Sequence, residues 1–487
     1  MSGANGLREP RVGIIGAGMS GIGIACKLRL AGIESFHLYE QSDDLGGTWH
    51  ANTYPGLSCD VPSRYYQYTF APNPDWSHVF SPGPEIKRYI DDVALRFDVR
   101  RRISFNTRVV DGRWEDGRWV VETDAGEHAE YDFLIAASGV LVQPRTPDIP
   151  GLELFAGKGF HSARWDHSVA LAGRRIAVIG TGSTGMQITR ALAPIASHYE
   201  LYQRTPQWII PLANRRYTRL GRALMRRFPP LNLWSYRTWQ WAAEGTLGLA
   251  VVRPGWQRSL LSWMCREHLR RGVRDPELRR RFTPPDLPMC KRLVGGTGFY
   301  QLFEQGAAKL VDTPIDHVAE RGIVTADGSL HELDVIVLAT GFDAHRFLLP
   351  IELTGIDGTR LSELWAREPF GYRTVAIPGF PNVFTLIGPH SPFGNQSLFT
   401  ISEVQADFAL RCIERWRRRS FDAMWPTREA TDQFNDDLRS VIPRTIWASG
   451  CRSWYLGADG TPSVWPWEPA HHREILGDPE PADWIVA

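Results

Sequence analysis

Short apolar runs recur along the chain, and most of them end at a glycine or at a polar residue. The runs in RVGIIGAGMSG and RRIAVIGTGSTG lead through glycine-rich loops into stretches whose apolar residues have helical spacing. Similar runs occur in SFHLYEQ, HYELYQRTP, YDFLIAASG and LDVIVLATG. Strands that alternate with helices indicate an α/β fold. The two glycine-rich loops predict that this fold contains two Rossmann-like dinucleotide-binding domains.

The first glycine-rich loop has the spacing Gly16-x-Gly18-x-x-Gly21. In the dinucleotide fold these glycines allow a tight turn, a close approach of backbone amides to a pyrophosphate, and close packing of helix on strand. The pyrophosphate rests on the helix N-terminus, where free N–H groups favour negative charge. The next apolar run ends at Glu40, near the spacing at which an acid binds an adenosine ribose. We interpret this unit as a nucleotide site, against the alternative of a glycine-rich turn without a ligand.

The second loop repeats this spacing, and its nucleotide-binding residues are expected to be Gly180, Gly182, Gly185 and Gln187. The strand that follows differs from the first, because Gln203 stands at the position that matches the ribose acid and Arg204 and Thr205 come next. Loss of the carboxylate and gain of a guanidinium favour a 2′-phosphate, and therefore NADP over NAD. A surface arginine at a strand end is the alternative for Arg204. The first unit is therefore predicted to hold FAD and the second NADP(H).

The positions of these units predict a division of the chain. The strands in YDFLIAASG and LDVIVLATG each end in small residues, as expected where a chain passes close to a dinucleotide while it crosses between domains. The Pro-rich stretch VQPRTPDIPG resembles a hinge. We therefore predict an FAD domain at 1–145 and 335–487, an NADP domain at 151–210 and 288–334, and a helical subdomain at 211–287 that is inserted in the NADP domain.

The stretch 211–287 has a composition of its own. RRYTRLGRALMRRF and WMCREHLRRG carry apolar residues at helical spacing, interleaved with arginines that outnumber the local acids. Tryptophans lie among them. A basic, tryptophan-containing helical region could make peripheral contact with an anionic membrane surface. Charge runs are more often solvated faces, so we favour a solvated helical subdomain.

Overall composition narrows the classes of function. With 487 residues, 43% hydrophobic and 22% charged, the chain has the make-up of a globular protein of more than one domain. The formal charge of +1 gives no argument for a nucleic-acid partner. The chain starts without the apolar segment of a signal peptide, and no run reaches the roughly 20 residues that cross a bilayer. The six cysteines lack paired spacing, which favours a reduced, cytoplasmic setting with most of them as small buried residues, and no metal site is expected.

Four further stretches match the pattern of one family. GGTWHANTYPGLSCD has Gly-Gly-x-Trp, then Tyr-Pro-Gly, then Asp, while PMCKRL and CRSWYLGAD supply a Lys-Arg pair and a tryptophan. FAGKGFHSARWD supplies a signature in the predicted linker before the NADP domain, namely Phe155, Gly157, His161, Trp165 and Asp166. With the two glycine loops, these stretches resemble the type I Baeyer–Villiger monooxygenases along nearly the whole chain. The related flavin-containing monooxygenases typically carry a tyrosine at the position of Trp165.

The resemblance implies an activity and a set of roles. An enzyme of this kind uses FAD and NADPH to convert a ketone and O₂ to an ester or lactone, through a flavin C4a-peroxide. Arg292 matches the active-site arginine, which stabilises negative charge on the reacting oxygens, and Asp60 matches the carboxylate that orients it. Lys291 is expected to share the 2′-phosphate with Arg204. Trp454 matches a tryptophan that lies against NADP.

The resemblance also assigns weaker roles to other residues. His161 of the signature is expected to help set how the NADP domain meets the flavin. Contacts to the flavin are expected from Gly47, Trp49 and Tyr66. The stretch 389–397 is expected to line the substrate cavity, although no motif identifies the ketone.

Three other activities fit parts of the pattern. A flavin monooxygenase that acts on sulfur or nitrogen is the nearest, and Trp165 together with the Asp60 and Arg292 pair argues against it. A disulfide reductase on the same scaffold requires two neighbouring cysteines beside the flavin, and no candidate pair is visible in the sequence. A non-catalytic flavoprotein that senses redox state is the alternative of another class, and intact Asp60, Lys291 and Arg292 count against it.

Overall fold

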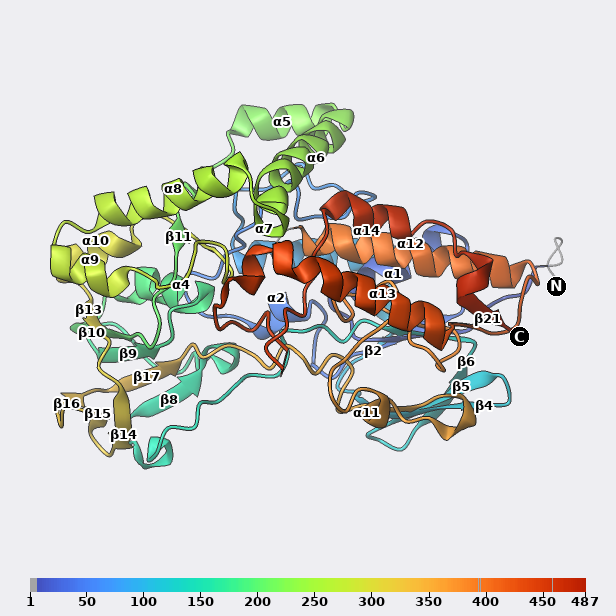
Figure 1. Cartoon of the computed structure of the whole chain (residues 1–487), viewed down its shortest axis with the longest axis horizontal. Helices are drawn as coiled ribbons and strands as arrows, with labels where there is room; N and C mark the ends of the chain where they lie inside the picture. Colours follow the sequence, from blue (N-terminus) through green and yellow to red (C-terminus); the bar gives the residue numbers. More distant parts are fainter. Residues whose placement is uncertain (1–6, 393, 395, 458) are drawn as a thin grey trace.

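Two parallel sheets form the framework of the computed structural model, which describes residues 7–392, 394, 396–457 and 459–487 (Figure 1). The first sheet has the order β19-β7-β1-β2-β3, with bounds Val383–Thr385, Phe133–Ala136, Val12–Ile15, Phe36–Tyr39 and Ile103–Ser104. The second has the order β13-β10-β9-β17-β8, with bounds Lys309–Val311, His198–Tyr202, Arg175–Ile179, Val335–Leu338 and Lys158–His161. The sheets lie at opposite ends of the molecule (Figure 1).

The predicted apolar runs are the central strands of these sheets. They form β1, β2 and β7 in the first sheet and β9, β10 and β17 in the second, and all pair in parallel. β1, β7 and β17 are buried at every position, which explains why they read as continuous apolar runs rather than as alternating ones. The predicted α/β fold with two Rossmann-like sheets is therefore confirmed.

The helices that follow the two glycine loops begin where the sequence predicts. α1 spans Met19–Leu30 and α4 spans Ser183–Leu192. α1 is buried along most of its length and packs against α12, Leu398–Arg417, from the C-terminal part of the chain. The first sheet and its helices are thus built from both ends of the chain, while the second sheet lies between them in sequence.

The position of β17 differs from the predicted division of the chain. Residues 335–487 were assigned with the first sheet, but β17 pairs with β9 and β8 of the second sheet, with Val335 opposite Ile176 and Lys158. The strand lies on the second-sheet side because its apolar side chains complete that core. The chain leaves the second sheet only after Leu338.

The two crossings between the halves run side by side. Pro144 and Phe342 form an antiparallel bridge. The N–H of Arg145 donates to the carbonyl of Gly341 at 2.9 Å, and the N–H of Asp343 donates to the carbonyl of Gln143 at 2.9 Å. The stretch predicted as a hinge is therefore one strand of a short two-stranded ribbon.

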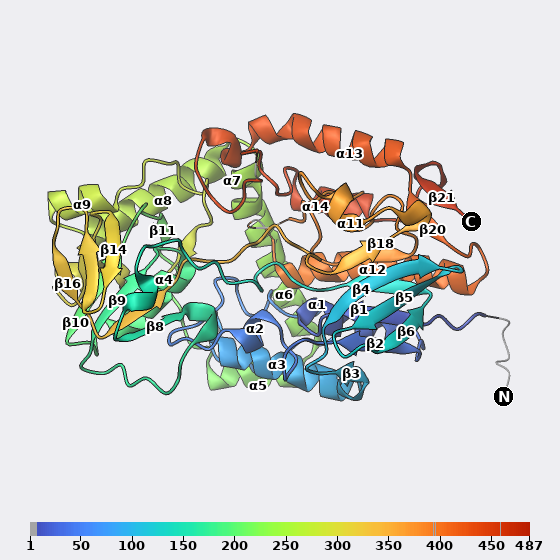
Figure 2. The same ribbon diagram turned by 90° about the horizontal axis from the view of Figure 1, so that it is seen from below.

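Smaller elements cover the two sheets (Figure 2). The first half also holds α2 (Thr48–Ala51), α3 (Gly83–Arg96), α11 (Leu361–Leu364), α13 (Arg428–Val441), α14 (Pro469–Ile475) and the strands β4 (Val109–Glu115), β5 (Arg118–Thr123), β6 (His128–Tyr131), β18 (Glu352–Thr354), β20 (Met424–Pro426) and β21 (Trp484–Val486). The second half also holds α10 (Phe299–Glu304) and the strands β11 (Ile209–Ile210), β12 (Val294–Gly295), β14 (Ile315–Ala319), β15 (Gly322–Thr325) and β16 (Leu330–Glu332).

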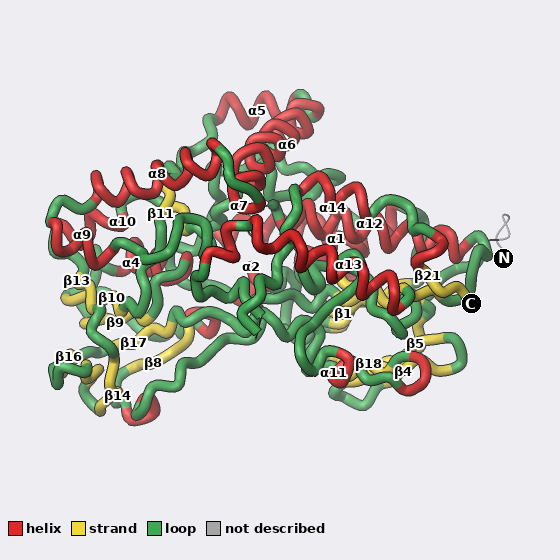
Figure 3. Tube along the Cα trace, in the orientation of Figure 1, coloured by secondary structure: helices red, strands yellow, loops and turns green. Residues whose placement is uncertain are grey.

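The arginine-rich stretch 211–287 is helical, as its periodicity predicts. Its α-helices are α5 (Arg219–Arg227), α6 (Pro230–Ala243), α7 (Leu249–Val252), α8 (Trp256–Gly272) and α9 (Pro276–Phe282). α5 and α6 stand out from the rest of the trace (Figure 3). α5 has no buried residue.

The cysteines depart in one respect from the sequence expectation. Four of them, Cys26, Cys59, Cys265 and Cys412, are free and buried, as expected of small core residues. Cys290 and Cys451 instead form a disulfide, although 161 residues separate them in sequence. The expectation that most cysteines are small buried residues therefore holds for these four, whereas the absence of paired spacing along the chain gave no sign of the disulfide.

The described residues contain neither a membrane-spanning helix nor a cluster of metal-binding side chains. None of the helices there combines the length and the apolar character needed to cross a membrane. Within the same residues, no group of three or more His, Cys, Asp or Glu side chains is placed to hold a metal ion.

Candidate active site between two glycine loops

At two positions of the first glycine loop, only glycine fits the backbone geometry. Gly16 has φ +101°, and a Cβ there would lie 2.5 Å from the carbonyl oxygen of Ala137. A Cβ on Gly21 would lie 1.9 Å from the carbonyl oxygen of Gly16. Both contacts are shorter than van der Waals packing allows, so the tight turn and the close approach of α1 depend on these glycines.

The end of α1 at this loop is open to an anion. The N-cap is Gly18, which provides no side-chain cap, and the first turn carries no acidic residue. The first N–H groups of the helix therefore keep their hydrogen-bonding capacity for a ligand. The Gly-Gly-x-Trp stretch lies over the loop, since the N–H of Gly46 donates to the carbonyl of Ala17 at 2.9 Å and a Cβ on Gly18 would lie 3.6 Å from the Cα of Gly47.

Glu40 is bound to the first loop, as its position at the end of β2 predicts. Its side chain is buried, and Oε2 accepts a hydrogen bond from the N–H of Ala17 at 2.8 Å. Oε1 accepts from the N–H of Ser42 at 2.9 Å. These two bonds fix the orientation of the carboxylate beside the loop.

The second glycine loop has nearly the same geometry. Gly180 has φ +120°, with a Cβ position 2.3 Å from the carbonyl oxygen of Ala339, and a Cβ on Gly185 would lie 1.9 Å from the carbonyl oxygen of Gly180. α4 begins without a side-chain cap and without an acid in its first turn. At Gly182, however, no described atom lies within 4 Å of a Cβ position, so this loop is open where the first is covered.

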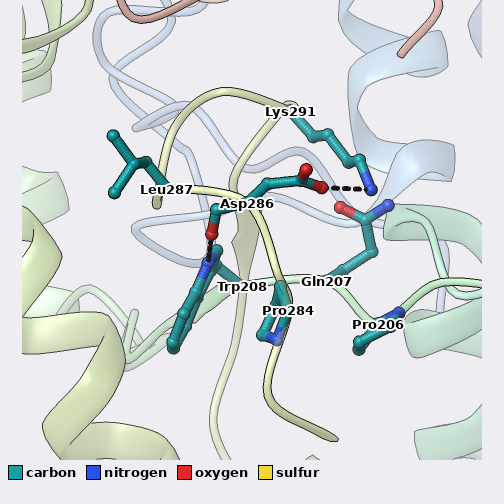
Figure 4. Close-up of a pocket in the computed structure, with 7 residues that line it drawn as sticks. All are labelled: Pro206, Gln207, Trp208, Pro284, Asp286, Leu287 and Lys291. Carbon is teal, nitrogen blue, oxygen red and sulfur yellow. Dashed lines mark hydrogen bonds and ion pairs between the residues drawn. The ribbon is translucent and has the colours of Figure 1, made fainter. Parts of the chain in front are cut away.

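Residues 206–208 after β10 and residues of the segment 284–291 line a small pocket (Figure 4). Arg204 is exposed at the end of the strand and has no ion-pair partner among the described residues. Lys291 lines the pocket with Pro206 and Trp208, and its Nζ lies 2.6 Å from a carboxylate oxygen of Asp286. Lys291 and Arg204 thus occupy neighbouring segments, although Lys291 is already paired with an acid.

Two further predicted residues beside this pocket make internal contacts. The side-chain amide of Gln203 donates to the carbonyl of Arg281 at 2.9 Å, which joins the end of β10 to α9. The hydroxyl of Thr181 donates to the carbonyl of Thr205 at 2.8 Å, which holds the end of β10 against the second glycine loop. Asp286, which the sequence analysis did not select, lies in the same short loop as Lys291.

Arg292 and Asp60, which are far apart in sequence, form an ion pair. Nη2 of Arg292 donates to Oδ1 of Asp60 at 2.8 Å, and both side chains are partly buried. The negative charge of Asp60 raises the pKa of Arg292 above its already high value, against the effect of burial. The arginine is therefore charged at every working pH.

The ion pair lies between the two glycine loops. On one side, the buried Tyr66 is near both charges and its hydroxyl lies 3.8 Å from Sδ of Met19, the first residue of α1. On the other side, Ser58 of the loop that carries Asp60 accepts a hydrogen bond at 2.9 Å from the side-chain amide of Gln187 on α4. A charged guanidinium is thus held where two loops suited to nucleotides approach each other.

Comparison with known proteins identifies the family to which this chain belongs. Residues 9–231 match the family model FMO-like, flavin-binding monooxygenase-like. Over 470 residues, 95% of this chain and 90% of the relative, the sequence is 36% identical to a Baeyer-Villiger monooxygenase of Streptomyces coelicolor. The chain belongs to the flavin-binding monooxygenase family, in its Baeyer–Villiger branch. It is also 52% identical, over 98% of its length and 96% of the relative, to an uncharacterized monooxygenase of Mycobacterium tuberculosis.

Solved structures agree with this family assignment. A closed crystal structure of cyclohexanone monooxygenase superimposes with a TM-score of 0.86 at 29% identity, covering 98% of this chain and 99% of that one. The structure of OTEMO in complex with FAD and NADP gives a TM-score of 0.87 at 30% identity, covering 99% of this chain and 100% of that one.

The signature of this flavin-binding monooxygenase has a structural explanation at its first two positions. A Cβ on Gly157 would lie 2.4 Å from the ring of Phe155 and 2.6 Å from the carbonyl oxygen of Asp334. The phenylalanine ring therefore covers the glycine, and each requires the other. The signature is also not a free linker, because β8 forms the edge of the second sheet.

The remaining signature residues lie at the end of β8. Nδ1 of the buried His161 accepts a hydrogen bond from the N–H of Ala163 at 3.1 Å, and burial lowers the pKa of the ring although the backbone of Gly341 opposes the shift. Its ring lies 6.0 Å from that of Phe342 in the other crossing. Trp165 packs on the second core, and Asp166 accepts two hydrogen bonds from Ser168. His161 thus lies at the end of β8, beside the two-stranded ribbon that joins the two halves.

The C-terminal stretch of the monooxygenase lies beside Arg292. The disulfide joins Cys290 to Cys451, close to Trp454, whose carbonyl accepts a hydrogen bond from His345 at 2.8 Å. Tyr455 is buried near Arg292, and burial raises its pKa while the guanidinium opposes the shift. The sequence analysis missed Tyr455, although it follows Trp454 directly.

The structure locates part of the stretch 389–397, predicted to line the substrate cavity, and Trp49, predicted to contact the flavin. A Cβ on Gly394 would lie 2.4 Å from the hydroxyl of Tyr455, which brings the stretch 389–397 near the arginine, while residues 393 and 395 lie outside the described residues. The ring of Trp49 lies 5.7 Å from that of Tyr66 in a T-shaped arrangement, beside the first loop.

Proposed function

We propose that the chain is an FAD- and NADPH-dependent Baeyer–Villiger monooxygenase that converts ketones to esters or lactones with O₂. The ion pair between Arg292 and Asp60 carries the proposal, because it places a permanent cation between two dinucleotide loops. Relatives named Baeyer-Villiger monooxygenase from Streptomyces coelicolor and Pseudomonas aeruginosa, at 36% and 33% identity, support the same chemistry.

The residues of both loops fit a dinucleotide. Each helix starts without a side-chain cap, so its first N–H groups are available to a pyrophosphate. The first loop would hold FAD through Gly16, Gly18 and Gly21, with Glu40 at the ribose. The second would hold NADPH through its own glycines, with the exposed Arg204 at the 2′-phosphate. The crystal structure of OTEMO is a complex with FAD and NADP, which supports this pairing.

FAD, when bound and reduced by NADPH, supplies the activation of O₂. Arg292 then binds negative charge that develops on oxygen atoms of the reactants, including the carbonyl oxygen of the ketone. Asp60 orients the guanidinium through their hydrogen bond and keeps it charged. Tyr455 is buried near Arg292, with Gly394 against its hydroxyl, while the side chain of Arg292 is 36% exposed and so accessible to a reactant.

The test compares Arg292→Ala with the wild type in two assays. The first follows reduction of the flavin by NADPH without oxygen, and the second follows ester formation from a cyclic ketone after oxygen is admitted. We expect the variant to keep flavin reduction and to lose ester formation by about a hundredfold or more, the effect typical of removing a preorganised charge donor. Asp60→Asn is expected to lose less, because the guanidinium remains but is no longer oriented.

The outcomes separate the alternatives. A wild type that oxidises sulfides or amines but leaves ketones unchanged would establish the heteroatom monooxygenase instead. A wild type whose flavin is not reduced by NADPH would favour a redox-sensing flavoprotein. Equal ester formation by Arg292→Ala and the wild type would remove the arginine from the mechanism.

A further inference from the structure

The helical subdomain turns apolar side chains toward solvent, beginning with α5. Leu220 and Leu224 lie one turn apart on this helix and are both exposed, and the exposed Phe228 caps its end. Arginines occupy the flanks of the same helix. An amphipathic helix normally buries its apolar stripe against the protein. Since α5 buries none of its residues, its apolar stripe has no partner among the described residues.

α6 is apolar on the outside and polar on the inside. Leu231, Trp234 and Trp241 share its outer face, and the two tryptophans are 67% and 77% exposed. The inner face buries Asn232 and Tyr236, whose hydroxyl is 2.7 Å from that of Thr400. This reverses the arrangement expected of a helix on the surface of a protein in water.

α8 repeats the same feature. Trp256, Leu260 and Trp263 have the spacing i, i+4, i+7 and are exposed, with Trp256 at 66%. The opposite face of the helix buries Cys265 in the core of the second half, and Leu261 in a cluster with α7 and residues of the C-terminal part of the chain. The outer stripe is therefore additional to the stripe that holds the helix in place.

These three helices lie along one side of the molecule, at the top of Figure 1, and Figure 2 shows that they extend across its depth. All four exposed tryptophans of the described residues lie on this surface, namely Trp234, Trp241, Trp256 and Trp263. We call this surface, formed by the outer faces of α5, α6 and α8, the Trp/Arg face.

The charge of the Trp/Arg face is positive and largely uncompensated. Arg219, Arg227, Arg237 and Arg266 are exposed and have no ion-pair partner among the described residues. The acids of these helices are used internally, since Glu244 pairs with Arg473 at 2.7 Å and Glu267 pairs with its helix neighbours. Free arginines around an apolar, tryptophan-rich surface complement a partner that is negative at its surface and apolar beneath.

We propose that the Trp/Arg face binds the surface of an anionic lipid bilayer. Tryptophan is enriched at membrane–water interfaces, where its ring sits at the level of the headgroups. Arginines near an anionic leaflet add attraction that salt screens. A second copy of the chain fits less well, because two such faces would bring their arginines together. This replaces the solvated subdomain favoured from sequence, since a solvated face would not expose these tryptophans.

Sedimentation of the purified holoenzyme with lipid vesicles tests the proposal. Vesicles of phosphatidylcholine alone are compared with vesicles that also contain phosphatidylglycerol, at low and high salt. We expect binding to the mixed vesicles, weakened by salt. The triple variant Arg219→Gln, Arg227→Gln and Arg237→Gln is expected to bind about a hundredfold more weakly, at about fivefold per arginine. Trp234→Ala with Trp241→Ala is expected to weaken binding while its salt dependence persists.

A matched control separates this face from general basicity. Arg418→Gln with Arg419→Gln removes two exposed arginines beyond the end of α12 and is expected to leave vesicle binding unchanged. All variants are expected to oxidise NADPH at the wild-type rate, which shows that they fold. Binding that is equal on neutral vesicles, or equal in the triple variant, would overturn the proposal. So would a wild-type dimer that the tryptophan variants convert to a monomer, because it would identify a second copy as the partner.

Discussion

The two glycine loops share a backbone and differ in what surrounds them. The N-cap residues Gly18 and Gly182 have nearly equal dihedral angles, φ −73°, ψ −173° and φ −69°, ψ −174°. The first loop is covered by Gly47 and braced by the carboxylate of Glu40, whereas the second is open at Gly182. Under the proposed function, the covered loop suits a cofactor that stays bound and the open loop suits one that enters and leaves. The surroundings, and not the motif, therefore distinguish the two sites.

The largest expected effect comes from matched alanine substitutions at the third glycine of each loop. Gly21→Ala and Gly185→Ala each place a Cβ 1.9 Å from a carbonyl oxygen of the same loop, so each loop must open. We expect Gly21→Ala to bind FAD about a hundredfold more weakly, the upper end of typical overpacking effects, and Gly185→Ala to do the same for NADPH. Flavin absorbance of the purified protein and NADPH titration measure the two.

Gly245→Ala is the control for these substitutions, because no described atom lies within 4 Å of the new Cβ position. It is expected to bind both nucleotides normally. If Gly21→Ala kept its flavin and lost NADPH, the assignment of the two loops would be reversed.

A smaller effect is expected where the second site recognises its phosphate. Arg204→Ala removes the exposed guanidinium at the end of β10, and one charge-assisted hydrogen bond is worth roughly 1.5–3 kcal/mol. We expect the KM for NADPH to rise at least about tenfold while the KM for NADH and the flavin content stay unchanged. Steady-state rates with both nucleotides give the ratio, and Arg174→Ala, at an exposed arginine before β9, is the control. An equal rise for NADH would show that Arg204 does not contact the 2′-phosphate.

The smallest effect concerns two buried carboxylates that respond to pH in opposite directions. Burial raises the pKa of Glu403, on α12 beside α1, from 4.5 to about 7 despite the nearby Lys27. Burial would also raise the pKa of Glu200 on β10, but hydrogen bonds from His331 and other neighbours outweigh it and lower the pKa to about 2. The contribution of Glu403 to folding stability is therefore lost as pH rises from 4.5 to about 7. The contribution of Glu200 is lost as pH falls from 4.5 to about 2.

Thermal unfolding across this pH range tests both directions. Glu403→Gln is expected to raise the Tm by a few degrees at neutral pH and to change little below pH 4.5. Glu200→Gln is expected to lower the Tm at neutral pH, because His331 and Lys309 lose their partner, and to change little near pH 2. If the Tm of Glu403→Gln matched that of the wild type at every pH, Glu403 would be ionised without cost in the folded protein.

Local features of the fold could be predicted from sequence because they depend on neighbouring residues. Strands buried on both faces are apolar at every position, so β1, β7 and β17 were visible as runs. Glu40 could be placed at the first loop because a fixed number of residues separates it from the glycines. The family motif supplied Asp60 and Arg292 as partners, and the structure places them 2.8 Å apart.

Pairings across long separations could not be predicted in this way. Neither periodicity nor spacing indicates that Cys290 meets Cys451, or that β17 joins the sheet of β9 rather than that of β1. The arginines of α5 and α6 were visible as a charge run, but which apolar residues face outward depends on how the helices pack. Whether apolar residues face outward decides between a solvated subdomain and a surface that binds a partner.

The ribbon formed by the two crossings has a mechanical consequence. Two separate tethers would let the halves turn about several axes, but hydrogen bonds join these strands between Gln143 and Asp343 and between Arg145 and Gly341. A paired ribbon flexes across its thin direction and resists torsion and shear. The paired crossing, with His161 beside it, therefore restricts how the halves can turn relative to each other. The disulfide between Cys290 and Cys451 is a further, covalent link close to Arg292, so ribbon and disulfide together restrain the position of this arginine relative to Asp60.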